Sequence, residues 1–213
     1  MTEEAAIGVD PLWIGTSWKM NKGLADSRQY IRELRANLGR TGHPGVQPFV
    51  IPSFTALAAV RDELGSDSPV LLGVQNAHWE DQGAWTGEVS VAQAKDAGAQ
   101  LVEIGHSERR ENFNETVETT RLKVAAVLAH GLVPLLCIGE SAEVNRAGGT
   151  SRFILEQSAG ALDGLTAEQL KSVLIAYEPI WAIGDGGRPA TVEELQAPFA
   201  DLGRVYGLSL IHI

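Results

Sequence analysis

Three polar side chains follow strand-like apolar runs and could together move a proton on a small molecule. Glu178 ends one such run, and Pro179 stiffens the chain directly after it. His106 and Lys19 follow two other runs of the same kind. A carboxylate can act as a base, an imidazole as an electrophile and an ammonium group as a local positive charge. The three residues therefore predict a proton-transfer site at the ends of several strands.

Longer motifs surround these residues and make the sequence recognisable. The motifs are Trp18-Lys19-Met20-Asn21, Gly83-Ala84-Trp85-Thr86-Gly87-Glu88, Gly105-His106-Ser107-Glu108-Arg109-Arg110, Pro134-Leu135-Leu136-Cys137-Ile138-Gly139-Glu140 and Ala176-Tyr177-Glu178-Pro179-Ile180-Trp181-Ala182-Ile183-Gly184. They resemble triosephosphate isomerase, and the resemblance runs from about Trp13 to Tyr206.

The resemblance implies a cofactor-free aldose–ketose isomerase that interconverts glyceraldehyde 3-phosphate and dihydroxyacetone phosphate through an enediolate, in glycolysis and gluconeogenesis. It makes Glu178 the base, His106 a neutral electrophile and Lys19 the cation near the phosphate and the developing oxyanion. Helix-start N–H groups at His106 disfavour imidazolium. His106 and Glu108 lack the spacing and the cysteine partners of a common metal site, so we expect no metal and no cofactor.

Further roles follow from the same resemblance. Ser17 and Gly184 are expected to bind substrate, Gly184 through its N–H to phosphate. Glu108 is expected to hold Lys19 or the His106 loop. Because its sequence neighbours are apolar, Cys137 is expected to be a buried small hydrophobic side chain behind the site rather than a nucleophile. A lid that closes over the substrate is expected to comprise Pro179, Ile180, Trp181, Ala182, Ile183, Gly184, Asp185, Gly186 and Gly187.

The loop from Asn76 to Glu88 resembles the family's interdigitating dimer loop. The resemblance implies a homodimer in which Thr86 reaches the partner's site near Lys19. A solvent-exposed loop is the alternative, although Trp79 and Trp85 would then lack a cover.

Three departures from the family pattern bear on the substrate. Ser17 stands where the family usually has asparagine, Asp185-Gly186-Gly187 replaces threonine, glycine and lysine, and Trp85 replaces a smaller aromatic residue. These changes resemble a branch that isomerises four-carbon erythrulose phosphates in erythritol catabolism, which is the alternative to a triose substrate.

Composition narrows the partners. The chain has 213 residues and a formal net charge of -10, which argues against nucleic acid and anionic membranes as partners. No apolar run approaches the ~20 residues of a membrane span. The N-terminus is acidic and does not resemble a signal peptide. The single Cys137 fits a reducing cytoplasm, so we expect a cytoplasmic enzyme whose partner is a small phosphorylated sugar.

Strand-like runs alternate with amphipathic ones, which predicts a parallel sheet with helices outside. By composition a doubly wound sheet fits equally well. The site motifs favour a TIM (β/α)8-type barrel, incomplete here, with about six βα units and the last two missing. The expected strands are 13–17, 48–51, 70–74, 101–104, 133–138 and 173–177. The expected helices are 24–38, 54–64 (capped by Ser53), 91–97 (capped by Ser90), 117–130, 151–162 and, opened by capping boxes at Thr166 and Thr191, 166–169 and 191–205.

We expect residues 1–207 to form a single domain. Residues 208–213 resemble a translated sequencing-adapter end and are expected to be a non-native tail, with an ordinary β-strand as the alternative. His212 therefore receives no catalytic role.

Two other functions remain open from sequence. One is an inactive fragment of a barrel, because the expected phosphate-binding turns after a seventh and an eighth strand are absent. The other is a different phosphate-binding barrel enzyme, such as an aldolase or a synthase. An aldolase of the Schiff-base type needs a lysine inside a barrel strand, and Lys19 fits that position poorly.

Overall fold

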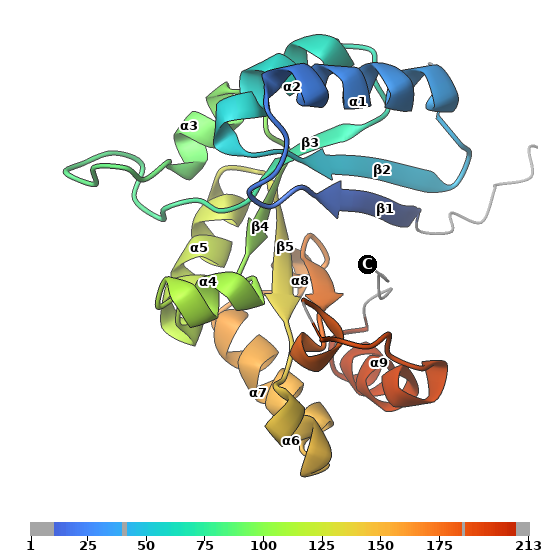
Figure 1. Cartoon of the computed structure of the whole chain (residues 1–213). Coiled ribbons are helices and arrows are strands. Elements are labelled where there is room, and N and C mark those ends of the chain that lie inside the picture. The colour runs from blue at the N-terminus through green and yellow to red at the C-terminus, as the bar shows by residue number, and fades with distance from the viewer. Residues whose placement is uncertain (1–10, 40–41, 185, 208–213) are drawn as a thin grey trace, which may run out of the picture.

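One curled parallel sheet organises the molecule. The structure is a computed structural model, and it describes residues 11–39, 42–184 and 186–207. Within these residues, six strands lie in the order of the sequence, each parallel to the next (Figure 1). The strands are β1 (Leu12–Ser17), β2 (Val46–Ile51), β3 (Leu71–Val74), β4 (Leu101–Ile104), β5 (Val133–Ile138) and β6 (Leu174–Tyr177).

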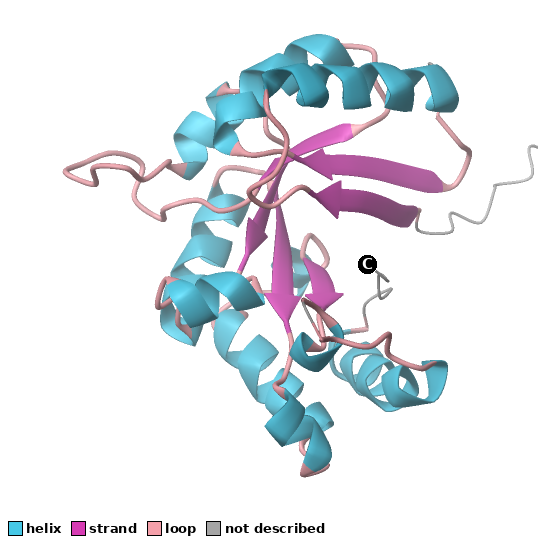
Figure 2. Cartoon of the chain, viewed as in Figure 1, coloured by secondary structure: helices cyan, strands magenta, loops and turns pink. Residues whose placement is uncertain are grey.

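Helices cover the outer face of this sheet (Figure 2). They are α1 (Leu24–Leu38), α2 (Leu57–Leu64), α3 (Val91–Asp96), α4 (Ser107–Asn112), α5 (Val117–Ala129), α6 (Ala142–Arg146), α7 (Thr150–Ala161), α8 (Ala167–Leu170) and α9 (Val192–Tyr206), with 3₁₀ turns η1 (Phe54–Ala56) and η2 (Ile180–Ala182). Helices on one face only, around a sheet that curls, make this an incomplete TIM-type barrel rather than a doubly wound sheet.

Two apolar layers hold the sheet in place. The larger layer lies between sheet and helices and includes Val50, Ile104 and Ile154. The smaller layer lies on the inner face, and its buried members are Phe49, Ile51, Leu101, Leu135, Cys137 and Ala176. Alternate residues of one strand supply the two layers, because successive side chains of a strand point to opposite faces.

Most expected element bounds agree with the structure to within two residues. The boxes at Thr166 and Thr191 and the cap at Ser90 are confirmed, since each side chain accepts a hydrogen bond from the backbone N–H three residues on. The cap at Ser53 is wrong: its hydroxyl bonds to the Thr55 hydroxyl instead, at 3.1 Å. The short turn η1 also precedes α2 where one continuous helix was expected. The proposed tail at 208–213 lies outside the described residues.

Candidate active site

Glu178 is positioned by a close approach between β5 and β6. Its backbone N–H donates to the Ile138 carbonyl at 2.7 Å, just where both strands end. Gly139 permits this approach, because a Cβ there would lie 1.8 Å from the Glu178 carbonyl oxygen. Any other residue at 139 would push the base out of place.

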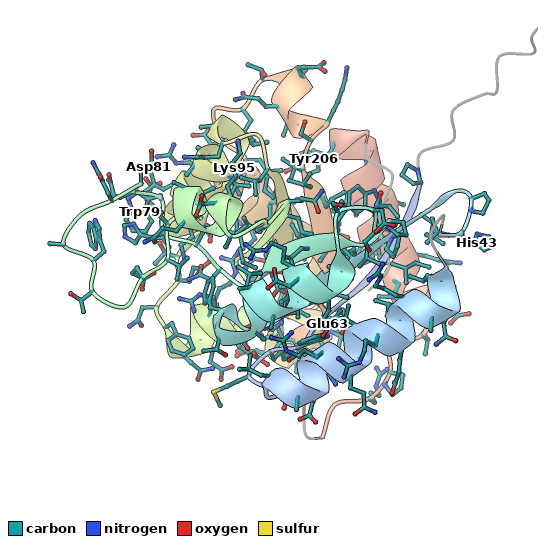
Figure 3. The ribbon with its side chains drawn as sticks, turned by 90° about the horizontal axis from the view of Figure 1, so that it is seen from above. His43, Glu63, Trp79, Asp81, Lys95 and Tyr206 are labelled. Carbon is teal, nitrogen blue, oxygen red and sulfur yellow. The ribbon has the colours of Figure 1, made fainter. Side chains whose placement is uncertain are left out.

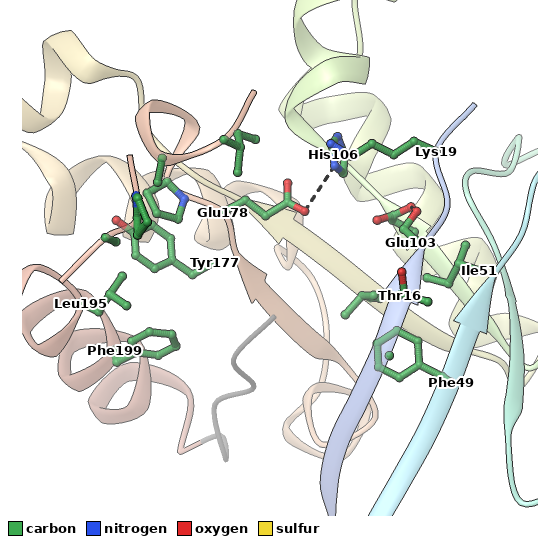
Figure 4. A pocket seen from close by; sticks show the side chains of 18 residues that line it. Thr16, Lys19, Phe49, Ile51, Glu103, His106, Tyr177, Glu178, Leu195 and Phe199 are labelled. Carbon is green, nitrogen blue, oxygen red and sulfur yellow. Dashed lines mark hydrogen bonds and ion pairs between the residues drawn. The ribbon is translucent and has the colours of Figure 1, made fainter. Parts of the chain in front are cut away.

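The Glu178 carboxylate has one oxygen without a hydrogen bond among the described residues. Its side chain is 14% exposed, and Oε1 lies 3.4 Å from Nε2 of His106 (Figure 4). The other oxygen, Oε2, is buried and has no hydrogen-bond partner among the described residues. Burial raises the pKa of Glu178, although the nearby His106 opposes the shift. A desolvated carboxylate with an unpartnered oxygen is well suited to accept a proton from carbon.

His106 is the N-cap of α4, and its hydrogen bonds define its tautomer. The ring Nδ1 accepts from the Glu108 backbone N–H at 3.2 Å. In a neutral ring the proton therefore lies on Nε2, the nitrogen that faces Glu178. His106 can thus donate a hydrogen bond from Nε2 to a substrate oxygen. We refer to His106 and Glu178 as the reacting pair.

A buried ion network fixes the loop that carries His106. The Glu115 carboxylate accepts from the Gly105 N–H at 2.8 Å, from Arg109 Nε at 2.8 Å and from Lys123 Nζ at 2.7 Å. Burial alone would raise the pKa of Glu115, but Lys123 and Arg109 outweigh it and hold that pKa below its usual value. The backbone at Gly105 has φ 75°, a left-handed conformation that favours glycine. The imidazole therefore rests on a rigid support.

Lys19 is held in an uncommon backbone conformation beside the same site. Its φ is 52°, which is rare for a residue with a side chain. Gln75 Nε2 donates to the Lys19 carbonyl at 2.8 Å, and the preceding Trp18 is buried. The ammonium donates to Glu108 Oε1 at 2.7 Å. Both expectations for Glu108 fit this geometry, since its side chain contacts Lys19 and its backbone contacts His106.

A second carboxylic acid, which the sequence interpretation missed, lies beneath the reacting pair. Glu103 belongs to β4 and is 5% exposed. The Ser17 hydroxyl donates to its Oε2 at 2.7 Å, and Cys137 Sγ lies 4.0 Å from its Oε1. Burial, which the Ser17 hydrogen bond only partly offsets, raises the pKa of Glu103 to about 8. We refer to Ser17 and Glu103 as the floor pair.

Cys137 is fully buried, as expected, and burial raises the pKa of its thiol. Its placement under the two carboxyl groups makes it a packing residue of the pocket. Donor atoms of Glu103, His106 and Glu178 all lie within 4.8 Å of one another. At that spacing the three groups could ligate a cation. Two carboxyl groups and one imidazole at this distance could equally well share a proton.

These groups open into one cavity of about 480 Å³ on the inner side of the sheet (Figure 4). The reacting pair, Lys19 and the floor pair all line it. Its other walls are mostly apolar: Gly15, Thr16, Phe49, Ile51, Leu135, Tyr177, Pro179, Ala182, Ile183, Pro189, Ala190, Leu195 and Phe199. An apolar pocket with a few convergent polar groups is typical of a small-molecule site.

The expected lid begins at a firm anchor. Trp181 lies in η2, and its Nε1 donates to Glu140 Oε1 at 2.7 Å. Glu140 is fully buried and also accepts from the Tyr177 hydroxyl at 2.9 Å. Ala182 and Ile183 line the cavity, whereas Gly184 is exposed and does not. Asp185, named above as part of the lid, lies outside the described residues.

The expected dimer loop projects from the body of the molecule. Trp79 and Asp81 mark it in Figure 3. Its aromatic residues cluster on His78, which stacks on Trp79 at 4.2 Å and tilts against Trp85 at 4.3 Å. Thr86 is exposed and does not line this chain's own cavity.

The structure thus brings together Glu178, His106, Lys19, Ser17, Glu108 and Cys137, which come from several different strand ends or the loops after them. Gly184 and Thr86 stand apart from them. Glu103 and Glu140 are the residues the sequence interpretation passed over. The signal for Glu103 was available, because it is the single charged residue in a four-residue strand whose other members are apolar.

Comparison with known proteins gives a family. A profile of triosephosphate isomerase matches residues 12–205. An L-erythrulose-1-phosphate isomerase from Mycolicibacterium smegmatis is 76% identical over 207 residues, covering 97% of this chain and 79% of that protein. Proteins of the same name from Brucella abortus biovar 1 and Rhizobium etli are each 50% identical. They cover 89% and 85% of this chain, and 74% and 68% of their own lengths.

Across the described part of the chain, every helix is too short or too polar to cross a membrane.

Proposed function

Because this chain belongs to the triosephosphate isomerase family, we propose that it isomerises a four-carbon sugar phosphate, L-erythrulose 1-phosphate, by enediolate proton transfer. The three relatives compared above carry that substrate in their names, which favours the four-carbon alternative over the triose and over a place in glycolysis. The observation that carries the proposal is the reacting pair: a desolvated carboxylate with an unpartnered oxygen, 3.4 Å from an imidazole whose Nε2 bears the proton.

The chemistry of this substrate defines the steps. C1 carries the phosphate and C2 the carbonyl, so the transferable proton lies on C3, which bears a hydroxyl group. The Glu178 carboxylate takes that proton while His106 Nε2 donates to the C2 oxygen, giving an enediolate across C2 and C3. His106 then shifts the hydroxyl proton from the C3 oxygen to the C2 oxygen, and Glu178 returns its proton to C2. The carbonyl ends on C3, so the product is again a ketose rather than an aldose.

Lys19 and the lid complete the proposed mechanism. The Lys19 ammonium stabilises negative charge on the enediolate oxygen and the phosphate. An enediolate next to a phosphorylated carbon can lose its phosphate, and closure of the segment 179–187 over the pocket protects against that loss. Gly184 N–H would then reach the phosphate. No step requires a metal or a redox cofactor.

We further propose a homodimer in the cytoplasm. The exposed Thr86 and the stacked aromatic residues of the 76–88 loop support a partner copy that covers the loop, and the single Cys137 fits a reducing compartment. The mass in solution by analytical ultracentrifugation tests the dimer, and a monomer at micromolar concentration would count against it.

The decisive experiment compares two substrates. Turnover of L-erythrulose 1-phosphate and of glyceraldehyde 3-phosphate is measured with a coupled assay, and the reaction is repeated in D₂O. We expect a kcat/KM at least about 10²-fold higher for the four-carbon substrate, with deuterium incorporated at C2 or C3. A higher kcat/KM for the triose would refute the proposed substrate. Turnover without deuterium incorporation in either reaction direction would refute a single base, Glu178, that removes and returns the proton.

A barrel fragment that binds without turnover is the second candidate. Within the described residues, β1 and β6 each pair with one neighbour, and Leu12 and Ile14 on β1 are about half exposed. The same assay separates the two, together with thermal unfolding. A cooperative melt with measurable turnover excludes the fragment, and ligand binding without turnover supports it.

A further inference from the structure

Glu103 occupies an inward position of the barrel, where apolar side chains dominate. It alternates along β4 with Val102 and Ile104, which belong to the layer under the helices, and so faces inward beside Leu101. Its surroundings on that face are the small apolar layer of the barrel interior. Burying a carboxyl group there is costly unless something binds it. Among the described residues, no lysine or arginine forms an ion pair with Glu103.

The contacts present leave the carboxyl group partly satisfied. Oε2 accepts from Ser17 at 2.7 Å, whereas Oε1 has only the weak Cys137 thiol donor, 4.0 Å away. With a pKa raised to about 8 by burial, the group is largely protonated at neutral pH. A neutral carboxylic acid has one O–H to donate and a carbonyl oxygen to accept. The floor pair therefore presents a donor and an acceptor to the cavity.

The floor pair lies deeper in the pocket than the reacting pair. Glu103 is within β4, whereas His106 follows the end of that strand. A carboxyl oxygen of Glu103, a carboxyl oxygen of Glu178 and a ring nitrogen of His106 are nevertheless within 4.8 Å of one another. In Figure 4, Glu103 lies below His106 and Lys19 and above Thr16 and Phe49. A substrate carbon attached directly to the reacting carbons would thus come within reach of Glu103.

The proposed substrate has such a carbon. Proton transfer occurs between C2 and C3, the phosphate is on C1, and the hydroxymethyl carbon C4 is therefore on the opposite side of the reacting centre. With the phosphate under the lid, at the mouth, C4 points down into the barrel. Its hydroxyl group would meet Ile51, Leu135 and Phe49 there, and a hydroxyl buried without a hydrogen-bond partner is costly.

We propose that Glu103, together with Ser17, binds the terminal C4 hydroxyl group and thereby selects a four-carbon over a three-carbon sugar phosphate. This inference rests on the proposed function. A triose phosphate has no group at this position, so it would leave the floor pair facing an empty or water-filled space. A site built to hydrogen-bond a hydroxyl discriminates strongly against the analogue that lacks it.

The test is the ratio of kcat/KM for L-erythrulose 1-phosphate to that for dihydroxyacetone phosphate. Glu103→Met replaces the carboxyl by an apolar group of similar length, and we expect the ratio to fall roughly 10- to 100-fold through the four-carbon substrate alone. Glu103→Gln keeps a donor and an acceptor and should keep the ratio within about threefold of the unchanged protein. Ser17→Ala should give a smaller fall in the ratio. Circular-dichroism melts of each variant verify folding.

Each outcome bears on one of the two proposals. If the unchanged protein prefers the triose, the proposed function fails before any variant is compared. If it prefers the four-carbon substrate but Glu103→Met lowers both activities equally, Glu103 supports the reacting pair and the inference is overturned. An unchanged ratio in Glu103→Met also overturns it. Abolition of wild-type turnover by EDTA would make the three clustered groups a cation site and would overturn it as well. Should Glu103→Met fail to fold, loss of the ratio in Glu103→Gln, or an unchanged ratio in Ser17→Ala, would overturn the inference.

Discussion

The reacting pair and the floor pair are neighbours, yet their polar atoms are satisfied in opposite ways. The reacting pair is positioned by backbone contacts and by Glu115, and no other described residue bonds to Glu178 Oε2. The floor pair bonds to itself, through Ser17 and Glu103, inside an apolar layer. A carboxylate with an unpartnered oxygen can accept a proton, whereas the floor pair, whose Oε1 has only a weak thiol donor, keeps one oxygen available to a ligand. Reaction type and substrate length can therefore be assigned to different residues, and changes at each should have different consequences.

The largest effect is expected at the reacting pair. Glu178→Gln removes the base, and turnover should fall by about 10³-fold or more for four-carbon and three-carbon substrates alike, because proton abstraction is common to both. Steady-state kinetics with both substrates measures this. The matched control is Glu156→Gln, an exposed glutamate paired with Arg152, which should leave turnover unchanged. A Glu178→Gln protein that retained activity with either substrate would remove Glu178 from the mechanism.

An intermediate effect is expected at the lid anchor, the Trp181–Glu140 hydrogen bond. Trp181→Phe removes the N–H that donates to Glu140, which loosens the start of the lid. We expect kcat/KM to fall about tenfold for both substrates, with the ratio preserved, and stability to fall by about 1–3 kcal/mol. Thr150→Val removes another donor to the same carboxylate from α7, at 3.2 Å. It should lower stability without changing turnover, so equal kinetic losses in the two variants would contradict a role in closure.

The smallest effect on turnover, but a distinct effect on stability, is expected for Glu103→Gln. The pKa of Glu103 is about 8 in the folded chain, against an ordinary value of 4.5. Since the folded-state pKa is raised, the stabilising contribution is fully present below about pH 4.5. It is lost as pH rises through about 8, by about 1.4 kcal/mol for each pH unit between the two values. Denaturant unfolding at about pH 5 and about pH 9 measures this loss.

Glu103→Gln cannot ionise, so its free energy of unfolding should decline less over that range. The nearby charged groups, Glu178, Lys19 and Glu108, are the same in both proteins, and their own titration largely cancels in the comparison. Parallel pH profiles for the two proteins would show that Glu103 is ionised throughout.

The sequence was sufficient for features that depend on local pattern. The bounds of β4 and β5 agree with expectation, because runs of apolar residues bounded by turns are a local signal. The capping boxes at Thr166 and Thr191 were found for the same reason. Ser53 failed because its hydroxyl has a nearer partner in Thr55, a competition between local bonds that residue type alone does not resolve.

Features that depend on strand pairing were harder to predict. His106 and Glu178 could be placed at strand ends, but their 3.4 Å separation depends on the curl of β4, β5 and β6. Glu103 was overlooked because the run 101–104 was interpreted only as a strand and its one charged residue received no role. Its contact with Ser17 joins residues 86 positions apart in the sequence. The periodicity of apolar residues along a strand does not indicate which other strand will face a given side chain.

The buried thiol of Cys137 also makes the protein convenient to follow. It is the single cysteine in 213 residues, and it lies directly beneath the two carboxyl groups. Thiol-modifying reagents act on the exposed thiolate, so labelling of the chain is a one-site reporter of how often this interior opens to solvent. A tightly bound substrate analogue should slow that labelling, which gives a measure of occupancy independent of turnover.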